Sequence, residues 1–159
     1  MKTLVVYYSH DGNSAFVAEQ IKAALGAELL RLETADSKKR GGLSKMFWGG
    51  RMVLTHTLPE LKPYHIEPEA WDLIILGAPV WAGSPAPPLM SFLAKTPLRD
   101  KRVAFFLCHA GGRGQAAEKL KQELAGNTIV GDIDFVNPNG DGGSRTVTDR
   151  ITGWVRQLG

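Results

Sequence analysis

The order of apolar segments constrains this chain most, because short strand-like runs alternate with amphipathic helical segments along its whole length. The runs are rich in apolar, β-branched and aromatic residues and span residues 4–8, 28–32, 73–76, 103–107 and 129–135. Helical spacing of apolar residues follows four of these five runs. Alternation of this kind predicts an α/β fold, a parallel sheet with helices on both faces.

The composition of each run indicates its place in the sheet. The first, third and fourth runs are apolar throughout, as strands buried on both faces must be. The second contains Arg31, and the fifth contains Asp132 and Asp134, so both are expected near the edges. Helices on both faces make a three-layer sandwich, and an open doubly wound sheet of five parallel strands with these edges has the order 2-1-3-4-5. In that order the loops after strands one, three and four meet at one end, where such sheets bind ligands.

Size, cysteine content and charge exclude several classes of protein. The 159 residues suit a single domain, 1–159, whose core needs no disulfide or metal. One cysteine, Cys108, excludes an internal disulfide and a multi-cysteine zinc site, and it suits a reducing cytoplasm. No apolar run is long enough to cross a membrane. A net charge of +3 without a recognition motif argues against nucleic-acid binding.

Residues 34–66 form a basic insertion between the second and third runs. The insertion holds six basic and two acidic residues, so the rest of the chain carries a net charge of −1. We expect a short helix at 44–48 and loop over most of the remainder. Trp48 lies among other apolar residues beside two glycines, a setting that favours contact with a ligand or partner. The basic residues 38–40 are expected to be a solvated surface.

The loop after the first strand, residues 9–14, reads Ser-His-Asp-Gly-Asn-Ser and leads into a helix. Hydroxyls, a glycine and free backbone amides at a helix N-terminus are suited to binding phosphate. The alternative is simple capping, with Asn13 or Ser14 as the N-cap residue. No Gly-Lys-Ser/Thr follows, which excludes a nucleoside-triphosphate loop.

The loop expected after the third strand, residues 77–88, contains four prolines, two glycines and Trp81. Prolines stiffen the loop, and glycines permit unusual backbone angles. A tryptophan at this end of the sheet would form a stacking surface for a planar ligand. Trp71 and Trp154, by contrast, are expected in the core.

The loop after the fourth strand, residues 108–114, reads Cys-His-Ala-Gly-Gly-Arg-Gly. Its glycines let backbone approach a ligand closely, and Arg113 is expected to meet an anion or a polarised carbonyl oxygen. Cysteine followed by histidine at a strand-to-helix turn leaves open a cysteine hydrolase or amidotransferase-like enzyme using Cys108 and His109. No third group that would orient this pair is evident, so Cys108 is more simply the end of a buried strand. No metal site is predicted, because the candidate ligands lack helical spacing.

Taken together, the three loops resemble those of the flavodoxin family. The resemblance is to bacterial flavodoxin-like FMN-binding proteins and covers essentially the whole chain. It rests on a Ser-x-x-Gly-Asn-Ser loop, a Pro-Val-Trp-x-Gly-x-Pro-Ala-Pro motif and a Cys-His-x-Gly-Gly loop. It implies a flavodoxin-like fold and a non-covalently bound FMN through which electrons pass.

The resemblance also assigns cofactor-binding residues to these loops. The first loop would hold the phosphate, the second would line the isoalloxazine, and the third would meet its other edge. His109, or Trp48 from the insertion, would cover the second ring face, and Gly83 is the candidate for the peptide flip that accompanies flavin reduction in flavodoxins. The residues so implied are Ser9, His10, Asp11, Gly12, Asn13, Ser14, Pro79, Val80, Trp81, Ala82, Gly83, Cys108, His109, Ala110, Gly111, Gly112 and Trp48.

Two redox functions follow from the resemblance. The absence of a separate dinucleotide fingerprint favours an electron carrier that serves a redox partner protein or a small acceptor. The alternative is a small FMN-dependent NAD(P)H:quinone-type reductase. Three features depart from the flavodoxin pattern. Asp11 stands at the third position of the phosphate loop, where Ser or Thr is usual, and the loop after strand four lacks the aromatic residue that often covers the second flavin face. The chain is also basic, whereas electron-carrier flavodoxins are usually acidic. We expect a cytoplasmic monomer or weak dimer with no membrane or nucleic-acid partner.

Overall fold

The computed structural model describes residues 1–35, 51, 57–140 and 145–159. The strands are β1 (Thr3–Tyr7), β2 (Glu28–Arg31), β3 (Leu73–Trp81), β4 (Ser84–Pro85), β5 (Arg102–His109) and β6 (Thr128–Val136). The helices are α1 (Asn13–Leu25), the 3₁₀ helix η1 (Pro68–Ala70), α3 (Pro87–Lys95), α4 (Ala116–Glu123) and α5 (Arg145–Val155). Trp48 and the helix expected at 44–48 lie outside the described residues. Within the described ranges, no helix is long and apolar enough to cross a membrane.

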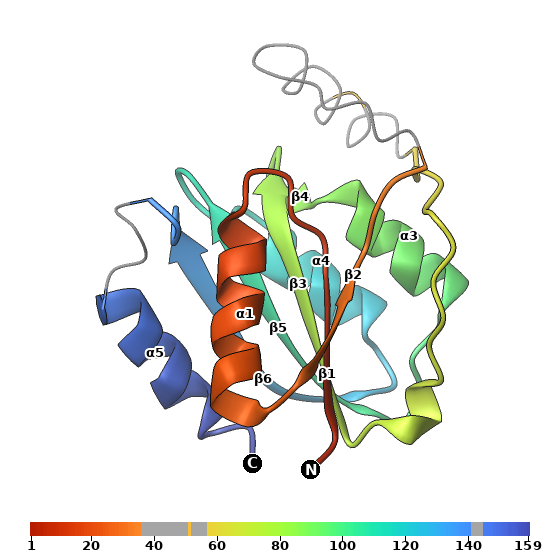
Figure 1. The fold of residues 1–159 in the computed structure, drawn as a ribbon. Coiled ribbons are helices and arrows are strands. Elements are labelled where there is room, and N and C mark those ends of the chain that lie inside the picture. The colour runs from red at the N-terminus through yellow and green to blue at the C-terminus, as the bar shows by residue number, and fades with distance from the viewer. Residues whose placement is uncertain (36–50, 52–56, 141–144) are drawn as a thin grey trace.

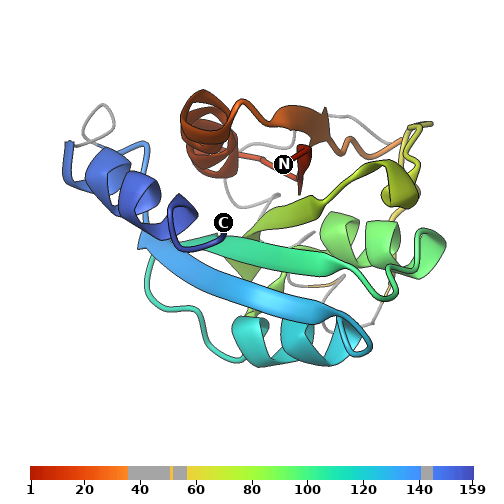
Figure 2. The ribbon, with the colours of Figure 1, turned by 90° about the horizontal axis from the view of Figure 1, so that it is seen from below.

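The five long strands form a parallel sheet in the order β2-β1-β3-β5-β6, with the short β4 paired antiparallel to β3. This confirms the predicted order and the edge positions of the second and fifth long strands. Helices α1 and α5 cover one face, and α3 and α4 cover the other (Figures 1 and 2). The loops after β1, β3 and β5 lie together at the end of the sheet opposite the two chain ends (Figure 1).

Alternation along β5 divides the core into two clusters. Phe106 and Cys108 pack on the α1/α5 face, where Phe106 and Ile75 form part of a fully buried layer with Trp154 of α5. Phe105 and Leu107 pack on the α3/α4 face. Because successive side chains of a strand point to opposite faces, His109 lies on the α3/α4 side and Cys108 on the other.

Strand β3 extends five residues beyond its predicted end at residue 76. The predicted loop 77–88 therefore begins as strand and returns as β4, with Trp81 opposite Ser84. Glycine and proline are rare inside strands, which is why the sequence suggested a loop here. Gly77 is needed in this strand for packing, because a Cβ there would lie 2.0 Å from the ring of Phe106.

Backbone hydrogen bonds join the described residues on either side of 36–50 and 52–56. Thr34 and Leu61 form an antiparallel bridge. The Ala35 N–H donates to the carbonyl of Glu60, and the Lys62 N–H donates to that of Glu33, both at 2.8 Å. Residues 33–35 and 60–62 are thereby held side by side.

Candidate functional site

Helix α1 begins without a side-chain cap. Its N-cap residue is Gly12, with φ of 93°, and the first intrahelical bond runs from the Phe16 N–H to the Gly12 carbonyl at 2.9 Å. The alternative interpretation, capping by Asn13 or Ser14, is therefore wrong. The amides of the first turn have no intrahelical acceptor, and the N-cap glycine has no side chain to cap them. The positive end of the helix dipole thus lies at the loop formed by residues 9–14.

The same loop contains a buried hydroxyl with no partner. Ser9 is 6% exposed, and its Oγ makes no hydrogen bond to any described residue. Its carbonyl accepts a hydrogen bond from Nη2 of Arg31 at 3.4 Å. A buried hydroxyl left unsatisfied costs about 1–3 kcal/mol. An oxygen-rich ligand at this helix N-terminus would remove that cost, so the residues present fit a phosphate group.

Charged and aromatic groups surround the loop. Burial of the phenol raises the pKa of Tyr8 to about 12, and the carboxylate of the exposed Asp11 adds to this shift. Arg31 acts in the opposite direction on the same pKa. The Tyr8 phenol therefore keeps its proton at neutral pH, and its oxygen lies 3.4 Å from Nδ1 of His10.

The β3–β4 hairpin places Trp81 beside this loop. The indole is half-buried and meets Tyr8 and His10 edge-to-face, with ring centroids 5.7 and 6.0 Å apart. The two turn residues, Ala82 and Gly83, both have positive φ, 47° and 71°. Such a pair defines a type I′ turn, whose twist matches that of the strands. The turn holds Trp81 at the carboxyl end of β3, with its indole half-exposed.

The loop after β5 is fixed by His109. Its Nε2 lies 2.9 Å from Oδ2 of Asp134, and its Nδ1 lies 2.9 Å from the backbone nitrogen of Gly112. Arg113 reaches Asp132 at 3.3 Å and Asp134 at 3.5 Å. The expectation that Arg113 meets a ligand anion is therefore corrected, since its guanidinium faces two carboxylates of β6.

Direct contacts join the three loops, as the predicted strand order requires. The Tyr8 N–H donates to the Gly77 carbonyl at 3.0 Å, linking the ends of β1 and β3. Gly114 approaches Gly83 so closely that a Cβ on Gly114 would lie 2.8 Å from the Gly83 Cα. Residues 9–14, 79–83 and 109–112 therefore share one end of the sheet.

Cys108 does not present its side chain to this end. The thiol is 2% exposed on the α1/α5 face, and burial raises its pKa to about 12. The Ser14 hydroxyl acts weakly in the opposite direction and makes no hydrogen bond of good geometry. Cys108 thus ends a buried strand, and the nucleophile interpretation has no support because the reactive thiolate is disfavoured. Its predicted role in cofactor binding stays a prediction, and it would involve the backbone rather than the buried thiol.

Three contributions were missed by the sequence analysis. Arg31 supports the carbonyl of Ser9, Asp134 orients His109, and Asn139 donates its N–H to Oδ1 of Asn13 at 3.0 Å. Arg31 and Asp134 are charged residues within apolar runs. Each lies on a strand that pairs with a strand leading into the site, β2 with β1 and β6 with β5, and this placement could have indicated their roles. The Asn139 contact joins segments 126 residues apart and has no sequence signal.

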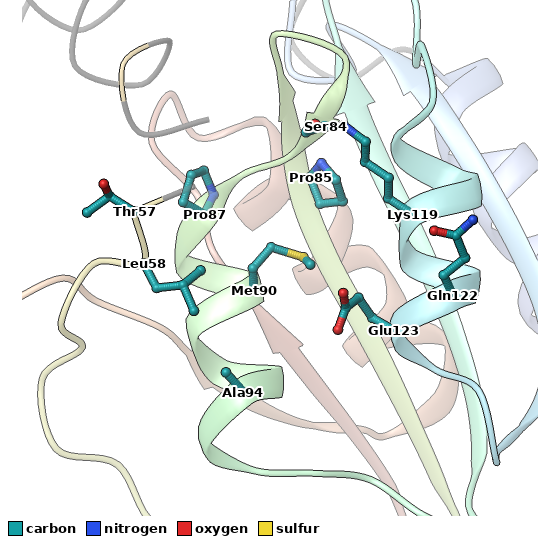
Figure 3. Close-up of a pocket in the computed structure, with 10 residues that line it drawn as sticks. All are labelled: Thr57, Leu58, Ser84, Pro85, Pro87, Met90, Ala94, Lys119, Gln122 and Glu123. Carbon is teal, nitrogen blue, oxygen red and sulfur yellow. Dashed lines mark hydrogen bonds between the residues drawn. The ribbon is translucent and has the colours of Figure 1, made fainter. Parts of the chain in front are cut away.

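A groove of about 340 Å³ runs between α3 and α4, beside the hairpin (Figure 3). Met90 projects into it from α3, and Lys119 of α4 reaches the Ser84 hydroxyl. Its described lining includes none of the residues predicted to bind FMN. Nor does the described part of the chain gather three or more His, Cys, Asp or Glu side chains that could hold a metal ion.

Comparisons with known proteins agree with this geometry. The family model for NADPH-dependent FMN reductase matches residues 1–141. No curated protein sequence is significantly similar to the chain. A flavoprotein from Lactobacillus acidophilus NCFM, solved in complex with FMN, is 25% identical with a TM-score of 0.73, over 84% of this chain and 92% of that one.

Two other solved structures share the fold at lower identity. Oxidised flavodoxin 2 from Bacillus cereus is 19% identical, with a TM-score of 0.64, over 99% of this chain and 97% of that one. A flavodoxin, WrbA-like protein from Agrobacterium tumefaciens is 18% identical, with a TM-score of 0.64, over 99% and 96%. These two matches confirm the flavodoxin-like fold. The family match, together with the FMN-bound Lactobacillus flavoprotein, confirms FMN as the cofactor. The chain belongs to the NADPH-dependent FMN reductase family.

Proposed function

We propose that this protein is an FMN-dependent oxidoreductase that takes electrons from NAD(P)H and passes them to a small acceptor. One structural observation carries the FMN part: an unpartnered buried hydroxyl, Ser9 Oγ, lies beside the uncapped N-terminus of α1. The family match supports direct use of NAD(P)H. The family match therefore favours the reductase. The electron carrier had been favoured only because the sequence has no separate dinucleotide fingerprint.

The phosphate of FMN would be held by residues 9–14. The Ser9 hydroxyl would donate to a phosphate oxygen, and the amides of the first turn of α1, beginning at Asn13, would donate to the others. Asp11 opposes this binding by charge, but its exposed carboxylate is screened by water and salt. Asn139 would keep the Asn13 side chain in place.

The ring would lie between the hairpin and the loop after β5. Trp81 would cover apolar ring surface, and its edge-to-face contacts with Tyr8 and His10 hold the indole in position. Gly83 has open space where a Cβ would stand, so backbone can approach the ligand. The exposed residues Ala110, Gly111 and Gly112 would meet the opposite edge. Bound there, the flavin supplies the chemistry of hydride acceptance and electron transfer.

An anaerobic visible absorption spectrum before and after addition of NADPH tests the proposal. We expect a yellow protein that releases FMN on denaturation and is bleached by NADPH within seconds. A yellow protein that dithionite bleaches but neither NADPH nor NADH does would instead be an electron carrier. A colourless protein that cannot be reconstituted with FMN would refute both.

Substitution of Trp81 tests where the ring lies. Trp81→Ala removes the covering indole, and we expect FMN affinity to fall about tenfold, since an aromatic pair contributes about 0.5–1.5 kcal/mol beyond area burial. Trp71→Ala is the control, because Trp71 is a half-buried tryptophan at the other end of β3. Equal effects of the two substitutions would show that the loss reflects general destabilisation and not contact with the flavin.

A further inference from the structure

The structure determines which nitrogen of His109 carries a proton. A backbone N–H can only donate, so the Gly112 N–H, 2.9 Å away, requires Nδ1 of His109 to accept. The ring proton of the neutral histidine is then on Nε2, which donates to Oδ2 of Asp134 at 2.9 Å. With its side chain only 8% exposed, His109 has both ring nitrogens engaged within the protein.

This arrangement gives the loop after β5 its shape. The His109 side chain accepts a hydrogen bond from the amide of Gly112, three residues later in the chain, as the side chain of an N-cap residue does in a helix. Ala110 and Gly111, both exposed, lie inside that turn, and Gly112 closes it with φ of 141°. Two adjacent glycines have little preference of their own, so the imidazole is what selects this conformation.

Asp134 is itself held by its two carboxylate oxygens. Oδ2 faces His109, whereas Oδ1 lies 3.5 Å from Nη1 of Arg113. Its carbonyl accepts from Nη2 of Arg150 at 3.2 Å. Asp132, two residues earlier on the same face, pairs instead with Arg113 at 3.3 Å and Lys121 at 3.4 Å. The two carboxylates share a cation, but of the two only Asp134 bonds the imidazole.

We propose that Asp134 is a positioning residue of the flavin site: it acts through His109 to hold residues 110–112 in the shape that receives the edge of the isoalloxazine. The proposal rests on the proposed function for its ligand. It does not require Asp134 or the imidazole to touch the flavin.

Asp134→Asn tests the proposal with almost no change of shape. An asparagine has only one acceptor oxygen. Because the Arg113 guanidinium can only donate, that oxygen would face Arg113. The amide nitrogen would then face Nε2 and donate to it, which moves the ring proton to Nδ1 and turns that atom from acceptor to donor. Asp132→Asn is the matched control, since it removes the same charge from the same strand face while leaving His109 bonded.

Three measurements on these variants are decisive. The ¹⁵N spectrum of His109 in the apo-protein should show Nε2–H in the wild type and in Asp132→Asn, and Nδ1–H in Asp134→Asn. Hydrogen exchange of the Gly112 amide should accelerate at least tenfold in Asp134→Asn only. The dissociation constant for FMN should rise about tenfold in Asp134→Asn and less than threefold in the control.

A double-mutant cycle tests whether Asp134 acts through His109. The His109→Asn substitution keeps a side-chain acceptor for the Gly112 amide, but the shorter side chain loses the hydrogen bond that Nε2 of His109 makes with Asp134. In a His109→Asn background, adding Asp134→Asn should therefore change FMN affinity less than twofold. A further tenfold loss in that background would overturn the proposal, as would an unchanged tautomer in Asp134→Asn or equal losses in the two Asp→Asn variants.

The outcomes also separate this proposal from the proposed function. The tautomer and the Gly112 exchange are measured without flavin, whereas the affinity needs it. If the wild type bound no FMN, the proposed function would fail, and the positioning role would fall with it. If the wild type bound FMN but Asp134→Asn bound it as tightly, only the positioning role would be refuted.

Discussion

The hydroxyl of Ser9 allows binding to be separated from folding at a single residue. Ser9→Ala removes a group that has no described partner within the chain, so the stability of the apo-protein should stay the same or rise slightly. FMN affinity should fall about tenfold, because a hydrogen bond to a charged group contributes about 1.5–3 kcal/mol. Titration of apo-protein with FMN, followed by flavin fluorescence, measures the affinity, and urea unfolding measures the stability.

Thr3 supplies the control for this residue. Its Oγ1 is also buried without a described hydrogen-bond partner, but it lies at the start of β1, the end away from the site. Thr3→Val should leave FMN affinity unchanged. A loss of affinity in Thr3→Val as large as in Ser9→Ala would mean that the Ser9 hydroxyl does not contact the phosphate.

Which residues of the site were predictable depends on how far apart their partners lie in the chain. The loop glycines, Ser9 and Trp81 were recognisable because each belongs to a short motif. Asp134 was recognisable only as an edge-strand charge. Its contact with His109 follows from the register that places Leu107 opposite Asp134, and register depends on packing that no local pattern specifies.

At the scale of elements, the β3–β4 hairpin contains a strained turn. Ala82 has φ of 47°, a left-handed conformation that costs an L-residue with a Cβ about 1–2 kcal/mol, whereas asparagine tolerates it better. Ala82→Asn should therefore raise the free energy of unfolding by about 0.5–1 kcal/mol. Chemical denaturation of the apo-protein measures this change.

The neighbouring turn residue is the matched comparison. A Cβ on Gly83 would meet nothing within 4 Å, so Gly83→Ala tests backbone strain alone, and we expect a loss of about 1 kcal/mol. If Ala82→Asn destabilised the protein and Gly83→Ala did not, the type I′ assignment of the turn would be wrong.

Strand β3 shows why the end of an element is harder to predict than its existence. Residues 73–76 were recognised from their apolar run, but Gly77 and Pro79 masked the continuation to Trp81. Glycine at 77 is dictated by the ring of Phe106 on the neighbouring strand and not by a turn. Gly77→Ala should destabilise the protein by about 1–3 kcal/mol through overpacking, as urea unfolding would show.

A Gly131→Ala variant provides a comparison in β6. A Cβ there would lie 2.8 Å from Cδ2 of the flexible Leu158 and 3.1 Å from Nε1 of Trp154, both farther than the 2.0 Å to the Phe106 ring at Gly77, so we expect a smaller loss than at Gly77. Equal losses would show that the rigid Phe106 ring is not what makes Gly77 necessary.

At the scale of the whole molecule, buried acids with raised pKa values lower the free energy of unfolding at alkaline pH, and the large shifts are those of Cys108 and Tyr8. The pKa values of Cys108 and Tyr8 are raised to about 12, from about 8.5 and about 10 in an unfolded chain. Above those unfolded values the unfolded chain releases protons that the folded chain keeps, so stability falls as pH rises. For Cys108 the loss begins near pH 8.5 and reaches about 1.4 kcal/mol per pH unit.

Unfolding by urea at pH 7, 8, 9 and 10 measures this loss in the wild type and in Cys108→Ser. A serine hydroxyl does not titrate in this range, so the decline between pH 8.5 and 10 should be shallower in the variant. Parallel declines in the two proteins would show that the Cys108 thiol does not set the alkaline limit.

The arrangement of the whole sheet was predictable because it depends on patterns repeated along the chain. Fully apolar runs indicated the central strands, and charges within the outer runs indicated the edges. The complete order, observed as β2-β1-β3-β5-β6, was expected from the doubly wound fold that the flavodoxin resemblance implies. The Asn139 contact with Asn13 was not predictable, because it joins the last loop to the first through tertiary packing alone.

The close approach of Gly114 to Gly83 also limits how this site can change over generations. A side chain at 114 would collide with backbone of the hairpin, and backbone cannot move aside without displacing the Trp81 turn. A side chain at position 83 would meet no neighbouring atom within 4 Å, so substitutions there fit the present structure, whereas a side chain at 114 requires the hairpin to rearrange. A library randomised at both positions and selected for FMN binding should therefore return glycine at 114 almost without exception and a mixture, rich in glycine and asparagine, at 83.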